Sequence, residues 1–224
     1  MIGYNRLGTN GRLGNQMFQY AALRGIAANN DLDWCIPPED TTTYANYGLF
    51  DAFKLKNLRN VGIVNGPTRD EPGFEFDEEL FNKCPDDVNI DGYRQSEKYF
   101  KNIEESIRED YEFKDEIYET CNEFISQFND NIILLHIRRG DNVGRPDWYP
   151  MPIEDHYEYL LEKHFTDNQP VLICSDDLEW VKEQNYFKKI DSTFLKQEFI
   201  IHIKLCNGIG QIGKILSFHF MICV

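Results

Sequence analysis

No stretch of the sequence is apolar for the length needed to cross a membrane, and residues 1–6 (MIGYNR) lack the pattern of a signal peptide. The six cysteines are scattered, form no Cys-x-x-Cys pair and have no histidine at zinc-ligand spacing. Such cysteines are typical of reduced, buried thiols rather than of a disulfide framework or a zinc centre. These absences predict a cytoplasmic protein with no strong membrane signal.

Positive charge is also scarce. The chain has 23 Lys and Arg residues against 38 Asp and Glu residues, a formal net charge of -15. An acidic surface repels polyanions, so nucleic acid is not an expected partner. A phosphate-bearing ligand would need a local cluster of arginines or backbone N–H groups, which makes each arginine cluster informative.

The composition excludes a disordered chain, since hydrophobic residues make up 42% and aromatic residues 14% of the 224 residues. Strand-like segments alternate with helix-like segments along the chain. The expected strands are residues 2–7, 88–93, 131–137 and 171–174. The expected helices are residues 15–29, 153–164 and 178–184, with one or two further helices within residues 97–128. This alternation predicts an α/β fold with parallel sheets, in two domains comprising residues 1–128 and 129–224.

A glycine-rich loop lies between the first expected strand and helix, and it ends in Gly14, Asn15 and Gln16. Glycines let the backbone approach a ligand, and N–H groups at a helix start attract anions or polar hydroxyls. The spacing of Gly8, Gly11 and Gly14 does not match the dinucleotide fingerprint, and no Lys-Ser/Thr pair completes a P-loop. A binding loop and a tight turn without a ligand both fit this pattern.

Two adjacent arginines, Arg138 and Arg139, follow the apolar run of residues 131–137, which is typical of a central parallel strand buried on both faces. Ligands of open α/β sheets bind beyond the carboxyl ends of the strands. Arginine forms bidentate, permanently charged hydrogen bonds with phosphate oxygens, so this pair suits a diphosphate. Surface ion pairs with some of the many carboxylates are the alternative.

Polar residues also follow the next expected strand, at Ser175, Asp176 and Asp177. A carboxylate there can accept the N1–H and the exocyclic amine of a guanine, and it can equally cap the helix that follows. His136, inside the preceding strand, fits a satisfied core histidine, and Asp141 fits a turn.

Residues 91–100 (DGYRQSEKYF) join a strand end to a helix through polar and aromatic side chains. The tyrosines and the phenylalanine fit a core, whereas Arg94, Gln95 and Lys98 fit contacts with a sugar. The sequence leaves these alternatives open.

Four segments, taken in order, resemble glycosyltransferase family 11, the alpha-1,2-fucosyltransferases. They are residues 11–21 (GRLGNQMFQYA), 92–100 (GYRQSEKYF), 136–141 (HIRRGD) and 175–180 (SDDLEW). The resemblance covers roughly residues 2–185 and implies a GT-B-like fold of two Rossmann-like units, the second of them incomplete. It further implies transfer of L-fucose from GDP-fucose to a hydroxyl of a galactose-containing glycan with inversion, without a cofactor or a metal.

The resemblance also implies roles for individual residues. Arg138 would bind the diphosphate and stabilise the leaving GDP, with Arg139 in support. The first domain would be the acceptor side and the second the donor side, with the general base left open and Asp141 as a candidate. His136 and Asp141 would shape the pocket around the diphosphate. Ser175 would belong to the donor site, and Asp176 or Asp177 would bind the guanine. Contacts with the donor or the acceptor would come from Gly14, Asn15 and Gln16.

Residues 199–224 contain no Asp or Glu, although about four acidic residues would be expected in a segment of this length. Their only Lys or Arg residues are Lys204 and Lys214. A hydrophobic core segment fits this composition, and so does a truncated or out-of-frame sequence, which is the interpretation we favour. The segment does not resemble the Asn-Ser-Ser/Thr and Trp-Trp segment that closes the family's second domain. An inactive remnant or nucleotide-binding module of the same family is therefore an alternative function. A nucleotide-binding oxidoreductase is a third, which the missing dinucleotide fingerprint disfavours.

Overall fold

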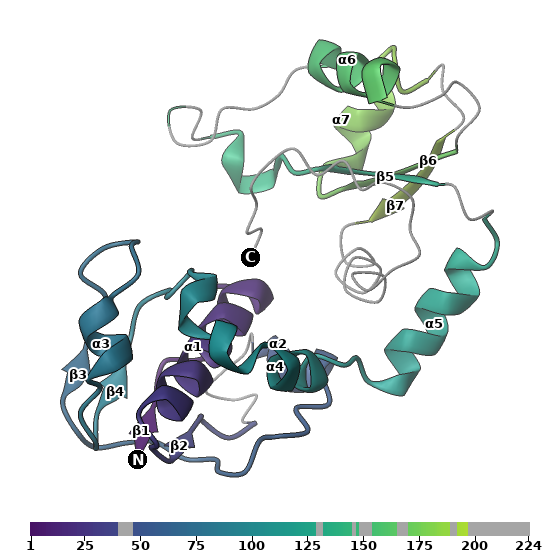
Figure 1. Ribbon diagram of the computed structural model, residues 1–224. Helices are drawn as coiled ribbons and strands as arrows, with labels where there is room; N and C mark the ends of the chain where they lie inside the picture. Colours follow the sequence, from purple (N-terminus) through teal and green to yellow (C-terminus); the bar gives the residue numbers. More distant parts are fainter. Residues whose placement is uncertain are drawn as a thin grey trace. The chain divides into compact units, whose positions relative to one another are not determined.

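The computed structural model describes residues 1–39, 47–128, 132–144, 147, 154–164, 170–188 and 192–196 (Figure 1). The chain divides into two compact units between Lys114 and Asp115. Each unit combines helices with a parallel sheet, which confirms the predicted α/β class. Residues 199–224, the tail with the unusual composition, lie outside the described residues.

The first unit has a four-stranded parallel sheet in the order β2-β1-β4-β3. Its strands have two residues each: β1 (Ile2–Gly3), β2 (Trp34–Cys35), β3 (Thr68–Arg69) and β4 (Asn89–Ile90). Its helices are α1 (Leu13–Asn29), α2 (Gly48–Ala52), α3 (Glu78–Asn82) and α4 (Glu104–Asp110), with the 3-10 turns η1 (Glu97–Tyr99) and η2 (Lys101–Ile103). The strands predicted at 2–7 and 88–93 are therefore shorter than expected.

Helix α1 is the centre of the first unit, with α3 on one side of it and α2 and α4 on the other (Figure 1). Most of its length is buried, and Tyr20, Leu23 and Ile26 have no exposed surface. A Cβ atom on Gly25 would overlap the carbonyl oxygen of Tyr99. Only glycine lets the backbone of η1 lie against α1 this closely, so residues 97–99 are held directly on the helix.

A buried ion pair joins α1 to the end of α4. Asp110 has no exposed surface, and its carboxylate pairs with the guanidinium of Arg24. The same carboxylate accepts hydrogen bonds from the hydroxyl of Tyr20 at 2.8 Å and from the backbone N–H of Asn57 at 2.6 Å. Arg24 also lies over the ring of Trp34, 5.5 Å from its centroid. One carboxylate thus ties together two helices and the loop after α2.

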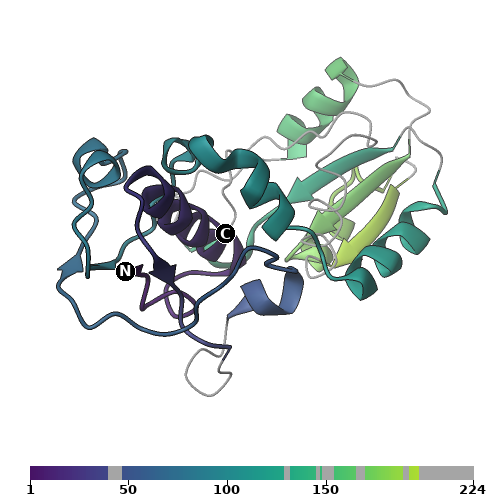
Figure 2. The same ribbon diagram turned by 60° about the horizontal axis from the view of Figure 1, so that its bottom comes forward.

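The second unit is organised around a three-stranded parallel sheet in the order β5-β6-β7. The strands are β5 (Ile133–Ile137), β6 (Val171–Ser175) and β7 (Ser192–Lys196). The helices are α5 (Asp115–Ile125), α6 (Glu154–His164) and α7 (Leu178–Glu183), with the 3-10 turn η3 (Gly140–Asn142). In Figure 2 the three strands run side by side, with α5 and α6 on opposite sides of them.

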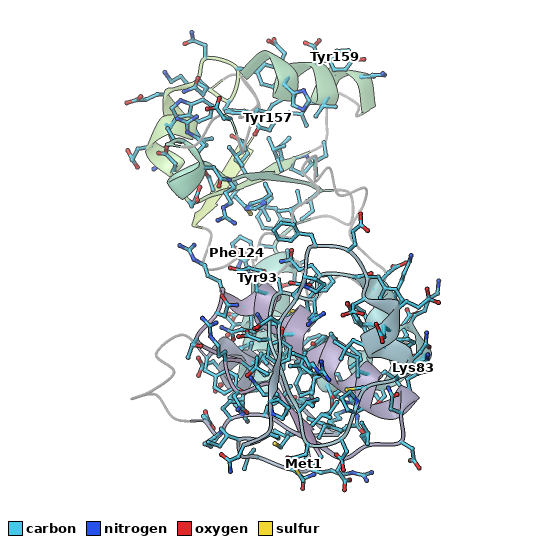
Figure 3. The ribbon with its side chains drawn as sticks, turned by 90° about the vertical axis from the view of Figure 1, so that its left-hand side faces the viewer. Met1, Lys83, Tyr93, Phe124, Tyr157 and Tyr159 are labelled. Atoms are coloured by element: carbon cyan, nitrogen blue, oxygen red, sulfur yellow. The ribbon has the colours of Figure 1, made fainter. Side chains whose placement is uncertain are left out.

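Alternating side chains of β5 enter two separate cores. Leu135 and Ile137 pack with Tyr157 of α6 and Val181 of α7, whereas Leu134 packs with residues of α5. Helix α6, by contrast, has one buried and one exposed side. Tyr157 is 5% exposed and Tyr159 is 55% exposed, and both are labelled in Figure 3. The prediction of a strand buried on both faces is confirmed. The middle strand of the described sheet, however, is β6 rather than β5.

The two units divide earlier in the sequence than the predicted boundary after residue 128. Helix α5 belongs to the second unit because its apolar side covers one face of the β5-β6-β7 sheet. Cys121 is 2% exposed in this core, and Ile117 and Phe124 pack against it. The helix-like pattern of residues 97–128 contains a break at Phe113, which bridges to Phe53, and this break separates α4 from α5.

We predict that Asp110→Ala lowers the free energy of unfolding by ~3–5 kcal/mol, because the charge of Arg24 would stay buried without its partner. Urea unfolding measures this change. Arg108→Ala is the matched control, since Arg108 lies on the same helix but pairs with Glu104 in solvent, and it should leave the unfolding midpoint unchanged. Equal midpoints for the two variants would refute the structural role of Asp110.

Candidate active site

The register of the second sheet brings two of the predicted segments together. Ile137 of β5 pairs with Ser175 of β6, so both strands end at the same level. Arg138 and Arg139 therefore leave the sheet beside Asp176 and Asp177, at the carboxyl edge where α/β sheets bind ligands.

Arg139 is held at this edge by three contacts. Its backbone N–H donates to the carboxylate of Asp176 at 2.7 Å, and its Nε donates to Oδ2 of Asp177 at 3.0 Å. Its guanidinium lies over the ring of Trp180, 3.8 Å from the centroid. The side chain of Arg139 is only 16% exposed. Arg139 therefore forms an ion pair within the chain, which was the alternative to a contact with a diphosphate.

The side chain of Arg138 points in a different direction from that of Arg139. Alternation along β5 places Leu135, Ile137 and then Arg139 on the α6 and α7 side of the sheet, where Arg139 meets Trp180. Continuing the same alternation places His136 and Arg138 toward the opposite side. Both of these side chains are half-buried. The two arginines, alike in sequence, thus occupy different surroundings.

Asp177 and Ser175 both stabilise the start of α7. The carboxylate of Asp177 accepts a hydrogen bond from the backbone N–H of Trp180 at 3.3 Å, and the hydroxyl of Ser175 accepts one from the N–H of Asp177 at 2.9 Å. The helix-cap alternative therefore describes what Asp177 does within this chain. Ser175 is 2% exposed, while Asp176 is exposed. A guanine-binding role for either aspartate stays a prediction.

The turn after the arginines leaves no room for a side chain at Gly140. A Cβ atom there would overlap Oδ2 of Asp176. Gly140 begins the 3-10 turn η3, which contains Asp141, the candidate base. The side chain of Asp141 is outside the part of the structure that is described.

Burial next to this cluster changes the ionisation of Tyr157. Removal from solvent raises the pKa of its hydroxyl to about 12, and the positive charge of Arg139 opposes that rise. Arg139 is thus close enough to the α6 core to influence it.

The glycine-rich loop of the first unit is tightly folded. Gly8 and Gly11 have φ angles of 91° and 82°, in the region that favours glycine. A side chain at Gly8 would overlap the ring of Tyr47, and one at Gly11 would overlap the side chain of Asn15. Both positions therefore require glycine for reasons of space as well as backbone angle.

The first turns of α1 bury three amide side chains. Asn15 is 8% exposed, and Gln16 and Gln19 have no exposed surface. Gln16 donates to the carbonyl of Gly11 at 3.3 Å, and Gln19 donates to the carbonyl of Asn10 at 3.2 Å. Gly14, the third predicted residue here, lies in the first turn of the helix. Two of these amides thus bind carbonyl groups of the glycine-rich loop.

Residues 91–100 prove to have mixed roles. Tyr99 and Arg94 have no exposed surface, so both are interior residues. Lys98 is exposed, and its Nζ lies 5.6 Å from the centroid of the Phe76 ring. Gln95 donates a hydrogen bond from its amide to Oδ1 of Asn15. The structure therefore joins this segment to the glycine-rich loop, a connection for which the sequence carries no periodic signal.

Within the described ranges there is no group of three His, Cys, Asp or Glu side chains that could hold a metal ion. Across the same residues, no helix combines the length and the apolar composition that crossing a membrane requires.

Solved structures show the class of fold to which this chain belongs. The fucosyltransferase NodZ from Bradyrhizobium superposes with a TM-score of 0.55 at 13% identity, covering 91% of this chain and 80% of that one. POFUT1 in complex with GDP superposes with a TM-score of 0.54 at 12% identity, covering 96% of each chain. The chain thus has the GT-B-like α/β fold of these glycosyltransferases.

The sequence comparison narrows the class to a family. The model of glycosyl transferase family 11 matches residues 1–208, so the chain belongs to that family of glycosyltransferases. An Escherichia coli alpha-1,2-colitosyltransferase is 29% identical over 77% of this chain and 69% of its own length. The Bos taurus galactoside 2-alpha-L-fucosyltransferase SEC1 is 25% identical over 80% of this chain. The chain spans 51% of that bovine relative and 40% of the Pongo pygmaeus galactoside alpha-(1,2)-fucosyltransferase 2.

We predict that Gly140→Ala destabilises the second unit by ~0.5–1.5 kcal/mol, because the added Cβ displaces the exposed carboxylate of Asp176 and breaks its hydrogen bond with the N–H of Arg139. Urea unfolding followed by tryptophan fluorescence measures the change. Gly144→Ala is the control, since a Cβ there meets nothing within 4 Å. A loss of the same size in both variants would show that the clash with Asp176 is not its cause.

Proposed function

We propose that this chain transfers L-fucose from GDP-fucose to a galactose hydroxyl of a glycan, with inversion and formation of an alpha-1,2 linkage. Membership of glycosyl transferase family 11 supports the reaction class. The bovine and ape relatives are named for galactoside alpha-1,2 transfer of fucose, whereas the Escherichia coli relative is named for colitose. The sugar and the acceptor are therefore the parts of the proposal that an assay must decide.

The observation that carries the proposal is that the side chains of Arg138 and Arg139 are directed to opposite sides of the sheet at its carboxyl edge. Arg139 is bound to Asp177 and stacked on Trp180. A side chain engaged in this way holds the strand end in place. Arg138, directed to the other side of the sheet, is the side chain that we assign to the diphosphate, with Arg139 in the supporting role.

The chemistry assigned to Arg138 is stabilisation of the leaving group. In a single inverting displacement the acceptor oxygen forms a bond to the anomeric carbon while the bond from that carbon to the β-phosphate oxygen breaks. GDP departs with the electron pair of the broken bond, so negative charge grows on its β-phosphate. A guanidinium already in place for this charge lowers the barrier more than it lowers the energy of bound GDP-fucose.

The acceptor proton leaves as the new bond forms, and Asp141 is our candidate to receive it. His136 shares the face of the strand from which Arg138 emerges and would line the same pocket. Asp176, which is exposed, is better placed to meet a guanine than Asp177, which caps α7. In the first unit, we assign Gly14, Asn15 and Gln16 to contacts with the donor or acceptor.

We predict that Arg138→Ala lowers kcat/KM for fucose transfer to lactose by about 100-fold or more, because the charge on departing GDP loses its stabilising partner. A radiometric assay with GDP-fucose measures transfer. Arg108→Ala, at a solvent-exposed ion pair, is the control and should behave as the parent chain does. A parent chain that is active and an Arg138→Ala variant within about threefold of it would refute the assignment.

Calorimetric titration with GDP separates binding from catalysis in the same samples. Binding with turnover supports the transferase. Binding without turnover, for every acceptor tested, would instead support a nucleotide-binding module, and absence of both would remove the proposed donor.

We also propose that the reaction needs no metal ion, since arginine supplies the positive charge that a divalent cation would otherwise provide. Transfer by the parent chain should therefore stay within about twofold of its rate when EDTA is added. A loss of transfer that Mg²⁺ or Mn²⁺ restores would contradict this prediction.

A further inference from the structure

The side chain of Asn15 is confined between two other parts of the first unit. On one side it lies against Gly11, where any side chain would overlap its amide nitrogen. On the other side its Oδ1 accepts the hydrogen bond from the amide of Gln95. Because its oxygen faces Gln95 and its nitrogen lies near Gly11, the amide is held in one of its two possible orientations.

The turn that carries Gln95 has an unfavourable backbone. Gly92 has a φ angle of 109° and Arg94 has one of 51°. The value at Gly92 suits glycine, but a residue with a long side chain rarely adopts the angle found at Arg94. A conformation of this kind persists only where surrounding contacts impose it, and such positions concentrate at functional sites.

Glu71 is the first of the contacts that impose this turn. Its carboxylate accepts hydrogen bonds from two consecutive backbone N–H groups, that of Tyr93 at 2.7 Å and that of Arg94 at 2.8 Å. Its side chain also fills the space beside Gly92, where a Cβ atom would overlap it. One carboxylate thus fixes the two residues immediately before Gln95.

The buried side chain of Arg94 makes the second set of contacts that impose the turn before Gln95. Its Nε donates to the carbonyl of Asp91 at 3.1 Å, and its Nη2 donates to the carbonyl of Arg69 at 3.0 Å. Its Nη1 lies 3.6 Å from the carboxylate of Asp77. A guanidinium with no exposed surface is costly to bury, and its partners here are backbone groups of the turn and of strand β3, together with the carboxylate of Asp77. It therefore contributes more to the shape of the turn than to stability.

The carbonyl of Gly92 makes the third set of contacts that impose this turn. It accepts hydrogen bonds from the hydroxyl of Tyr4 at 2.6 Å and from the amide of Gln19 at 3.0 Å. These two donors come from the end of β1 and from α1, the elements on either side of the glycine-rich loop. The turn is thus built onto the same elements that position Asn15.

We propose that Gln95 is a positioning residue for the transfer reaction, and that it acts by holding the amide of Asn15 in a fixed orientation toward the substrate. The inference rests on the proposed function, because Asn15 belongs to the loop assigned there to donor or acceptor. The strained turn, Glu71 and Arg94 together present Gln95 to Asn15. Gln95 itself needs no contact with substrate.

The test is a double-mutant cycle with four chains: the parent, Gln95→Met, Asn15→Ala and the double variant. Methionine matches glutamine in length and lacks its donor. We expect Gln95→Met to lower kcat for fucose transfer about tenfold and to change KM for GDP-fucose less than about threefold. In the Asn15→Ala background the same change should alter kcat less than about twofold, since its target is already absent. Lys101→Met, at an exposed position of the 3-10 turn η2 that follows this segment, should leave both constants unchanged.

Urea unfolding of the same four chains tests the contact without substrate. The unfolding constant of the double variant should differ by about fivefold from the value that independent effects would give. Multiplicative effects on kcat, or an unchanged kcat in Gln95→Met, would overturn the proposal. A parent chain without transfer activity would remove the proposed function itself, and the unfolding cycle would then still decide whether Gln95 holds Asn15.

Discussion

The pairing of Ile137 with Ser175 determines which side chains meet at the carboxyl edge of the sheet in the second unit. Parallel strands in this register end at the same level, so the residues that follow them meet at one edge of the sheet. Arg139 then finds both Asp176 and Asp177 within hydrogen-bonding distance. A shift of one residue would turn Arg139 away from Trp180 and exchange the directions of the two arginines. The proposed donor site thus depends on strand register before it depends on any side chain.

An acidic chain has many carboxylates available, and this one uses several of them to hold arginines inside. Arg24 is paired with Asp110, Arg94 with Asp77, and Arg139 with Asp177. Burying a charge is costly, and a buried pair often contributes little net stability compared with apolar residues of the same size. Each pair instead links segments that are distant in the sequence. In the first unit this linkage is needed because strands of two residues offer few hydrogen bonds of their own.

Four elements of the second unit could be predicted from the sequence, because continuous apolar runs and amphipathic segments mark β5, β6, α6 and α7, whereas the strand β7 was not expected. In the first unit α1 and the positions of β1 and β4 were expected, but β2 and β3 were not, since strands of two residues are too short for any periodicity. The sequence left open whether residues 97–128 form one or two helices, and the bridge between Phe53 and Phe113 that separates α4 from α5 comes from tertiary contact. The domain boundary was displaced for the same reason, since the surface that α5 covers is formed by strands later in the chain.

The candidate site was predictable as a set of segments but not as a set of contacts. Consecutive arginines at a strand end look alike in sequence, and only the alternation of the strand together with Trp180 in α7 distinguishes Arg139 from Arg138. Glu71 is one acidic residue among 38, and nothing near it in the sequence indicates that it holds the turn before Gln95. Contacts of this kind depend on long-range geometry, which local patterns do not encode.

The end of β5 and the glycine-rich loop have one physical requirement in common. In each of them, a residue assigned to substrate lies beside a residue that other contacts hold in place. A group that must stabilise charge or orient a hydroxyl is effective only if it does not have to reorganise during the reaction. Its neighbours therefore have to remove its freedom in advance. Arg139, bound through its backbone and its side chain, does this for the strand end that carries Arg138. Gln95, fixed by a strained turn, does it for Asn15. In both places the residue assigned to substrate lies next to a residue whose own position is fixed by other contacts within the chain.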